Sequence, residues 1–258
     1  MDGLTREQWL SQSRFEPLET PEVIDRILLK IRSFKSNGRR AFVLLDLDST
    51  LYEVAERSAR ILRLAAEEFP WLPEATRAQL STAAPEKMGY SIADTWCLLG
   101  LEPDAAALEQ VETFWRAHFF SNAFLCHDQL YEHTFDWVHR LYAEGAEIVY
   151  LTGRDIGGMH AGTLECLRRD GLPLDHRTHL CMKDNRERDD VEHKTAVAER
   201  FAALGEIVAS FENEPRNFVA LRQAFPDALH VFVDTISSRK MASPVEGVYR
   251  MRPSSRVR

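Results

Sequence analysis

The sequence has few cysteines and no cysteine pair at metal-binding or redox spacing. Its four cysteines are Cys97, Cys126, Cys166 and Cys181, and none of them forms a CxxC motif. The spacing therefore predicts neither a zinc site nor a disulfide framework. We expect reduced thiols and a cytoplasmic protein.

Long apolar runs are also absent. The longest runs, such as Ala41–Leu45, fall far short of the roughly 20 residues that cross a bilayer. The first residues carry no basic segment followed by an apolar stretch, so no signal peptide is expected. These absences exclude a membrane-spanning protein from the expected classes.

The chain has no excess of basic residues. It contains 32 Lys and Arg against 40 Asp and Glu, which gives a net charge of −8 and a pI of about 5.6. A domain that binds nucleic acid is normally basic, so a nucleic-acid polymer is not the expected partner. The sequence also lacks a GxxxxGK[ST] phosphate loop and a GxSxG nucleophile elbow.

Short apolar runs alternate with helical patterns in much of the chain. Strands are predicted at 41–45, 147–151, 178–182, 206–211 and 228–233, and helical periodicity lies between the later ones. Such alternation is typical of parallel βαβ units with right-handed crossovers. We therefore predict an α/β fold with a doubly wound parallel sheet.

One long block does not follow this alternation. Residues 53–140 show helical patterns throughout, which predicts an inserted, all-helical cap domain. The α/β core would comprise 41–52 and 141–236, after a helical extension at 1–40. The tail, 237–258, has six basic residues and one acidic residue, and its segment 247–251 could add an edge strand.

Polar side chains follow the predicted strands at three places, and a lysine follows a fourth strand after a loop. Asp46 and Asp48 come after the first core strand, Thr152 after the second, and Glu212 after a later one. Lys194 lies near the start of a predicted helix. The carboxyl ends of parallel strands meet at one edge of the sheet, so these groups should share one site.

The residue types in this site suit phosphoryl transfer. One carboxylate can attack phosphorus, and a second carboxylate two residues later can move the proton. A hydroxyl, a backbone N–H and a lysine can hold the phosphoryl oxygens. Further carboxylates can bind Mg²⁺, which prefers oxygen ligands.

Four sequence motifs resemble those of the haloacid dehalogenase superfamily, specifically its phosphatase branch. Asp46-Leu47-Asp48-Ser49-Thr50 matches the DxDxT motif, and Leu151-Thr152-Gly153-Arg154 resembles the second motif. Lys194 resembles the lysine of the third motif, and Phe211-Glu212-Asn213-Glu214-Pro215 resembles the acidic fourth motif. The resemblance covers roughly 41–233, and the helical block lies where this superfamily inserts a cap.

The resemblance implies a role for each matching residue. Asp46 would be the nucleophile and Asp48 the general acid and base. Thr152, Gly153 and Lys194 would bind the phosphoryl group. Mg²⁺ would be held by Asp46, the Asp48 carbonyl and the fourth motif, with Glu212 and Asn213 as its candidates. The implied function is a hydrolase acting on a small phosphorylated substrate.

Two departures leave alternatives open. The fourth motif usually carries Asp, often paired, whereas this chain has Glu212-Asn213, so metal could bind more weakly and Glu214 is a substitute ligand. Lys183 competes with Lys194 for the phosphate, and we favour Lys194 because it opens an amphipathic helix. The competing functions are a phosphotransferase or mutase and a non-catalytic phosphate-binding module.

The other motif-like pieces are interpreted as structural. We expect the pairs His127-Asp128 and Glu132-His133 to be solvated helix residues. The predicted cap has 14 acidic and seven basic residues, which disfavours long polyanions as substrates. Candidate substrate-selecting residues in the cap are Lys87, Met88, Gly89, Tyr90, Arg116, His118, Phe119 and Asn122.

Overall fold

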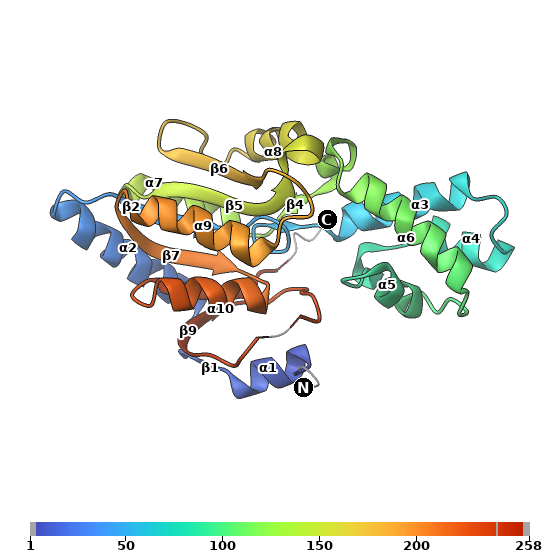
Figure 1. Cartoon of the computed structure of the whole chain (residues 1–258), viewed down its shortest axis with the longest axis horizontal. Coiled ribbons are helices and arrows are strands. Elements are labelled where there is room, and N and C mark those ends of the chain that lie inside the picture. Colours follow the sequence, from blue (N-terminus) through green and yellow to red (C-terminus); the bar gives the residue numbers. More distant parts are fainter. Residues whose placement is uncertain (1–3, 241, 255–258) are drawn as a thin grey trace.

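The computed structural model describes residues 4–240 and 242–254. An α/β part and a smaller group of helices lie side by side (Figure 1). The α/β part holds a seven-stranded sheet with the order β1-β9-β8-β7-β2-β5-β6, in which neighbouring strands are parallel. Its strands are β1 (Arg14–Phe15), β2 (Ala41–Leu45), β5 (Glu147–Asp155), β6 (Thr178–Lys183), β7 (Glu206–Glu212), β8 (Leu229–Val233) and β9 (Glu246–Met251).

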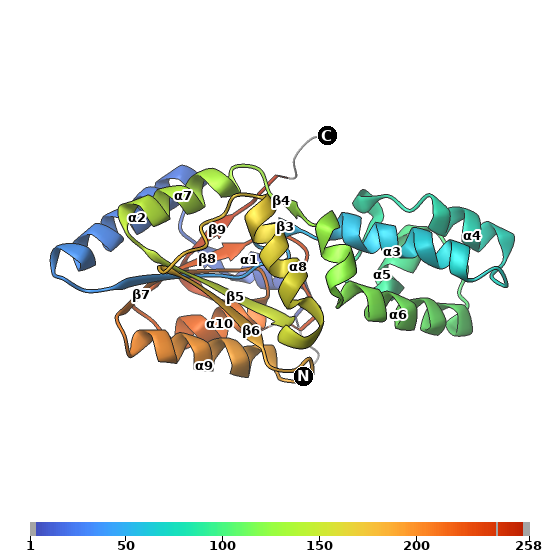
Figure 2. The ribbon, with the colours of Figure 1, turned by 90° about the horizontal axis from the view of Figure 1, so that it is seen from above.

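Strand β2 shows why the sheet is covered on both faces. Successive side chains of a strand point to opposite faces, and all five of β2 are buried. Val43 and Leu45 pack with helices on one face, and Phe42 and Leu44 pack with helices on the other. Figure 2 shows these two helical layers. The first layer is α2 (Thr20–Ser36), α7 (Thr134–Glu144) and α8 (Ile156–Arg169), and the second is α9 (Asp190–Ala202) and α10 (Pro215–Ala224).

The order of the strands confirms the doubly wound α/β fold. After β2 the chain adds β5 and then β6 on one side, and it returns to add β7, β8 and β9 on the other. Strand β5 is longer than predicted because it runs past a register shift to Asp155, which pairs with Lys183 of β6. Asp155 then caps α8, because its Oδ1 accepts a hydrogen bond of 2.7 Å from the Gly158 N–H.

The helical group has a core of its own. Apolar side chains from each of its four α-helices pack together in one cluster, which includes Leu62, Leu80, Trp96 and Val111. The helices are α3 (Ala55–Glu68), α4 (Glu74–Ser81), α5 (Ile92–Leu98) and α6 (Ala105–Phe119), with a 3₁₀ turn η1 (Pro85–Lys87). We call α3–α6 the helical unit. Among the described residues, no helix has the length and apolar character that a membrane crossing requires.

Two connections join the helical unit to the sheet. The outgoing one contains β3 (Tyr52–Glu53), and the returning one contains the 3₁₀ helix η2 (Asn122–His127) and β4 (Gln129–Leu130). Strands β3 and β4 pair in antiparallel fashion. The chain therefore leaves and re-enters the α/β part at neighbouring points.

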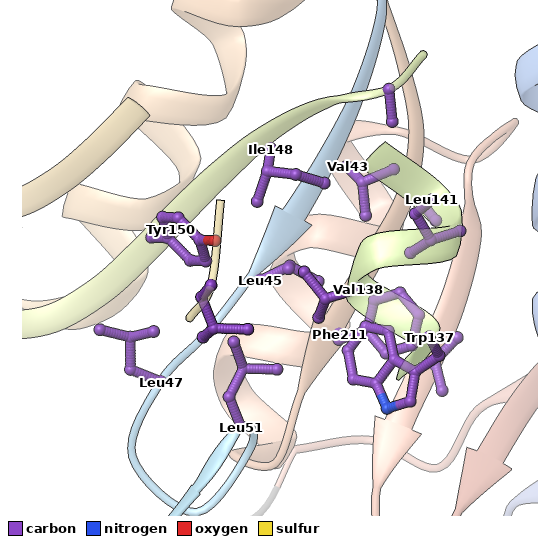
Figure 3. Close-up of a cluster of buried hydrophobic side chains, with 14 of the residues drawn as sticks. Val43, Leu45, Leu47, Leu51, Trp137, Val138, Leu141, Ile148, Tyr150 and Phe211 are labelled. Carbon is purple, nitrogen blue, oxygen red and sulfur yellow. The ribbon is translucent and has the colours of Figure 1, made fainter. Parts of the chain in front are cut away.

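Helix α7 belongs to the α/β part, although its sequence pattern continues the predicted cap. Figure 3 shows Trp137, Val138 and Leu141 of α7 facing the side chains of the sheet. The rings of Trp137 and Phe211 stack, with centroids 4.7 Å apart and an angle of 14° between their planes. Helical periodicity alone could not separate α7 from the preceding helices, because the partner of its apolar face is distant in sequence.

The two terminal regions meet at one edge of the sheet. Strand β9 forms as predicted for the tail, but it is not the edge strand, because β1 pairs with its outer side. The extension at 1–40 thus contributes a strand as well as α1 (Arg6–Gln12) and α2. Trp9 of α1 is buried among the rings of Phe15, Phe218 and Phe232, which fixes α1 against this edge.

Helix α8 approaches the returning connection closely at two glycines. A Cβ at Gly158 would lie 2.6 Å from the carbonyl oxygen of Phe120, and one at Gly162 would lie 2.8 Å from that of Asn122. The Gly162 N–H also donates a hydrogen bond of 2.7 Å to Asn122 Oδ1. Alanine at Gly162 would push η2 away from α8, and alanine at Gly158 would push away the end of α6 at Phe120.

We expect Gly162→Ala to destabilise the protein by about 1–3 kcal/mol, the usual cost of overpacking. Gly157→Ala on the same helix is the matched control, because its Cβ would make only an ordinary 3.4 Å contact. Alanine favours helix more than glycine, so the control should be neutral or slightly stabilising. Urea denaturation measures both variants, and equal stabilities would contradict the close packing of α8 on η2.

Candidate active site

The predicted site residues meet at the carboxyl edge of the sheet. Leu45 of β2 is in register with Tyr150 of β5 and with Phe211 of β7. Asp46 therefore follows its strand at the level where Glu212 ends β7 and where β5 continues to Thr152. Lys194 reaches the same edge from the start of α9.

Lys194 bridges two buried carboxylates. Its Nζ donates hydrogen bonds of 2.7 Å to Asp46 Oδ1 and of 2.6 Å to Glu212 Oε2. All three side chains are almost completely removed from solvent. Glu212 Oε1 accepts a further bond of 3.0 Å from the Glu214 N–H, which fixes the orientation of the carboxylate.

The turn after β2 completes the surroundings of Asp46. Ser49 adopts a left-handed conformation with φ of 59°, and its N–H donates to the Tyr52 carbonyl at 2.7 Å. This turn brings Thr50 back to Asp46, so the Thr50 hydroxyl lies 2.8 Å from Asp46 Oδ2 and 3.3 Å from Asn213 Oδ1. Both oxygens of Asp46 are thus held by a hydrogen-bond donor.

Burial controls the protonation of this group. It raises the pKa of Asp46 above its usual range, although Lys194 and Thr50 oppose the change. Burial also raises the pKa of Glu212 to about 8, against the opposing charge of Lys194. Burial alone would lower the pKa of Lys194, but the charges of Asp46 and Glu212 outweigh it and raise that pKa. One ammonium therefore serves two carboxylates, and the site can accept more positive charge.

The second candidate lysine has other partners. Lys183 Nζ donates to Asp190 Oδ1 at 2.9 Å and to the Arg186 carbonyl at 2.8 Å. Gly153 lies beside the same acid, because a Cβ on it would be 3.2 Å from the Asp190 carboxylate oxygens. The lysine in contact with Asp46 is Lys194.

Asp48 belongs to a second group of charges. Its Oδ1 accepts hydrogen bonds of 2.7 Å from Arg57 Nη2 and of 2.6 Å from Arg154 Nη2. Burial works against the charge of Asp48, but the two guanidinium groups outweigh it and hold the pKa of this carboxyl well below its usual range. Asp48 is therefore a carboxylate.

Asp128 balances the two arginines. Its Oδ2 accepts a bond of 2.7 Å from Arg154 Nη2, and its Oδ1 lies 2.9 Å from Arg57 Nε. Burial raises the pKa of Asp128 to about 6, although both arginines oppose the change. The expectation that Asp128 is a solvated helix residue is wrong, because it follows η2 into the interior and neutralises a buried charge. We call Asp48, Arg57, Asp128 and Arg154 the charge cluster.

A cavity of about 680 Å³ lies above the sheet edge and extends to the helical unit. Its floor includes Asp46, Thr152, Lys194 and Glu212. Five of the eight candidate substrate-selecting residues line the cavity, namely Met88, Gly89, Tyr90, Arg116 and Phe119. An ion pair between Arg239 and Asp94 of α5 forms a separate contact between the α/β part and the helical unit.

The other selecting candidates are used in packing or lie outside this lining. His118 Nδ1 is 2.8 Å from the Phe114 carbonyl, and Asn122 binds Gly162. Lys87 is not among the lining residues of the cavity. Glu214, the substitute metal ligand, lines the cavity but accepts hydrogen bonds of 2.8 and 2.6 Å from the N–H and hydroxyl of Ser238.

The oxygen donors around Asp46 fit Mg²⁺. Within the described residues, no group of three or more acidic, histidine or cysteine side chains is placed to hold a metal. Mg²⁺ needs fewer, because it often binds through one or two carboxylates and keeps several waters. Asp46 and Glu212 supply two carboxylates, and Asn213 adds an amide oxygen whose Nδ2 is anchored to the Ile236 carbonyl at 2.7 Å. The donor set is entirely oxygen, as a hard cation requires.

Three contacts made by the predicted site residues were not predicted from the sequence. The first is the hydrogen bond from the Thr50 hydroxyl to Asp46. The other two are the ion pairs of Arg57 and Arg154 with Asp48. Arg57 lies four residues before Ile61, so a charged residue on the apolar face of α3 was the available signal. Arg154 follows Thr152 in the same motif, but its partner Asp128 lies in a segment with no motif.

Comparisons with known proteins address the fold. No protein-family model matches the chain, and a search of curated proteins returned no significant match. Among solved structures, a proposed phosphatase from Clostridium difficile matches with a TM-score of 0.56 at 14% identity, over 83% of this chain and 95% of that one.

Two other matches have lower TM-scores. A haloacid dehalogenase-like family hydrolase from Streptococcus pneumoniae matches with a TM-score of 0.48 at 10% identity, over 82% of this chain and 95% of that one. A proposed β-phosphoglucomutase from Thermotoga maritima matches with 0.46 at 16% identity, over 81% and 94%. The first match, to the proposed phosphatase from Clostridium difficile, shows that the chain shares the α/β fold of that protein.

Proposed function

We propose that the protein is a Mg²⁺-dependent phosphatase that hydrolyses a small phosphomonoester through an aspartyl-phosphate intermediate. The observation that carries this proposal is the setting of Asp46. Its carboxylate lies on the floor of a cavity, with Lys194 on one oxygen and Thr50 on the other. The helical unit would act as the cap over this cavity.

In the first step, an oxygen of Asp46 attacks phosphorus and the bond from phosphorus to the ester oxygen breaks. The bonding electrons go to the ester oxygen, which takes a proton from the protonated form of Asp48 and leaves as the alcohol. Lys194 and the hydroxyl of Thr152 hold the phosphoryl oxygens during the transfer. Bound Mg²⁺, held by Asp46, the Asp48 backbone carbonyl, Glu212 and Asn213, would offset the charge of the phosphate.

In the second step, water attacks phosphorus and the bond to Asp46 breaks, which releases phosphate and restores the carboxylate. Asp48 takes the proton that the water loses. The arginines keep Asp48 in the ionised form that this step requires. In the first step Asp48 must instead be protonated to donate a proton to the leaving oxygen, and the arginines disfavour that form. Esters with an acidic leaving group need this proton less, so they should react more readily.

The cavity supports a small substrate. Its volume of about 680 Å³ lies within the range of small-molecule pockets. The acidic helical unit makes a long polyanion a poor fit, since it would repel the extra phosphates.

The test is release of inorganic phosphate from an aryl phosphate and from a panel of phosphorylated metabolites. We expect activity with Mg²⁺, and we expect chelation of the metal to lower it by more than about 100-fold, since a metal contributes several kcal/mol to charge stabilisation. Added Mg²⁺ should restore the rate. Phosphate release that is unaffected by chelation would contradict the assigned metal role.

The same assay separates the two alternatives. A mutase or phosphotransferase needs an acceptor, so steady phosphate release without one favours the phosphatase. A non-catalytic module would bind phosphate without turnover. Calorimetric titration with Mg²⁺ then shows whether Glu212-Asn213 holds a metal.

A further inference from the structure

The charge cluster links the catalytic edge of the sheet to both chain connections of the helical unit. Asp48 and Arg154 come from the sheet edge, whereas Arg57 lies in the first turn of α3 and Asp128 follows η2. Each arginine contacts both carboxylates. Asp48 and Arg154 of the α/β part are thus paired with Arg57 of the helical unit and Asp128 of the returning connection.

Only one member of the cluster is accessible. The Asp48 side chain is 31% exposed, whereas those of Arg57, Asp128 and Arg154 are 0–1% exposed. Arg57 has further buried contacts: its Nη1 donates to the Phe119 carbonyl at 3.2 Å, and its guanidinium lies 3.9 Å from the Phe119 ring centroid. The cluster therefore presents Asp48 to the cavity from a fixed support.

The two oxygens of Asp48 differ in their contacts. Oδ1 accepts from Arg57 Nη2, from Arg154 Nη2 and, at 3.2 Å, from Arg154 Nε. Oδ2 accepts one long bond of 3.3 Å from Arg154 Nε. The arginines thus hold Oδ1, and Oδ2 has capacity for a further partner.

We propose that Arg57 is a positioning residue for the reaction: by holding Oδ1 of Asp48 it aims Oδ2 at the water that attacks the aspartyl phosphate. This inference rests on the proposed phosphatase function. Arg57 is not among the lining residues of the cavity and pairs with Asp48, so it would act on the reaction through Asp48. Its place on α3 makes the helical unit a contributor to the second chemical step.

A contribution to folding stability does not by itself explain why the four charges of the cluster are buried together. Buried ion pairs are often no more stabilising than apolar residues of similar volume, because the charges lose their hydration. Orientation is what they supply, since two guanidinium groups on one oxygen leave the carboxylate little freedom to rotate.

The test compares variants that keep the charge balanced. Arg57→Met alone would leave an excess buried carboxylate and could fail to fold, so the key variant is Arg57→Met/Asp128→Asn, in which Asp48 keeps Arg154. Arg57→Lys is the conservative variant. Arg60→Met is the control, because Arg60 lies on the same helix but is half-exposed and pairs with Glu56.

Each variant is assayed with an aryl phosphate, and the phosphoenzyme is trapped by acid quench. We expect the balanced variant to keep its melting temperature and its kcat/KM within about twofold. Its kcat and KM should fall together by about 10- to 100-fold, because the second step becomes rate-limiting and general base catalysis is partly lost. The trapped phosphoenzyme fraction should rise, because the second step is slowed. Arg57→Lys should recover part of kcat, and Arg60→Met should match the wild type.

Two results would overturn the inference in different ways. A stable balanced variant with the kcat of the wild type, or one that changes KM alone, shows that Arg57 is purely structural while the phosphatase function stands. A wild-type chain that forms no phosphoenzyme and releases no phosphate removes the proposed function, and the positioning role with it.

Discussion

Asp46→Asn should abolish phosphate release, with kcat/KM lowered by at least about 10⁴-fold, because an amide cannot replace the attacking carboxylate. The variant should remain folded. Lys194 keeps its bond to Glu212, and the substitution removes one of the two carboxylates that share this lysine. A melting curve and circular dichroism establish folding, and acid-quench trapping should find no phosphoenzyme.

The control for this variant is Asp184→Asn, which removes an exposed acid from the loop before α9. It should leave turnover unchanged within about twofold, since exposed charges contribute little. A folded Asp46→Asn protein that retains a tenth or more of the activity would show that another group attacks the phosphate.

Lys194→Ala should affect both activity and stability. We expect kcat/KM to fall by at least about 10³-fold, because the cation that faces the transferring group is lost. This corresponds to a loss of transition-state stabilisation on the order of 4 kcal/mol. Removing one partner of a buried ion pair typically costs about 3–5 kcal/mol of folding free energy. The pKa of Glu212 is already raised to about 8, so this carboxylate can take up a proton when Lys194 is removed. The loss of folding free energy should therefore lie near the lower end of that range.

Two further variants separate these effects. Lys194→Ala/Glu212→Gln removes one of the two carboxylates that Lys194 had compensated, so it should regain part of the lost stability without regaining activity. Lys183→Ala should lower both activity and stability less than Lys194→Ala does. Its acid partner Asp190 is half-exposed, so water can solvate the carboxylate that is left unpaired. A larger loss of turnover in Lys183→Ala than in Lys194→Ala would reverse the assignment of the two lysines.

The sequence predicts the sheet well because its strands are short apolar runs with a local signal. Val43 and Phe42 face different helical layers, yet both are apolar, and this is the pattern of a strand buried on both faces. Asp46, Thr152 and Glu212 could be grouped because parallel strands place their carboxyl ends together.

Contacts between distant segments without a motif could not be predicted. Asp128 is preceded by a histidine and lies in a short polar stretch, which is indistinguishable in sequence from a solvated turn. Its burial depends on two arginines, 71 and 26 residues away in sequence. In the same way, nothing near Arg14 indicates that its two-residue strand pairs with β9.

The pairing of β1 with β9 has a consequence for synthesis of the chain. Arg14 is in register with Glu246, so a segment made early needs one made about 230 residues later. At about 5–20 residues per second, the ribosome takes roughly 10–50 s to supply that partner. During this interval Trp9 and Phe15 have neither β9 nor the late segments that bury them, which leaves apolar surface for a chaperone or for aggregation. Slower elongation late in the message should therefore lower the soluble yield.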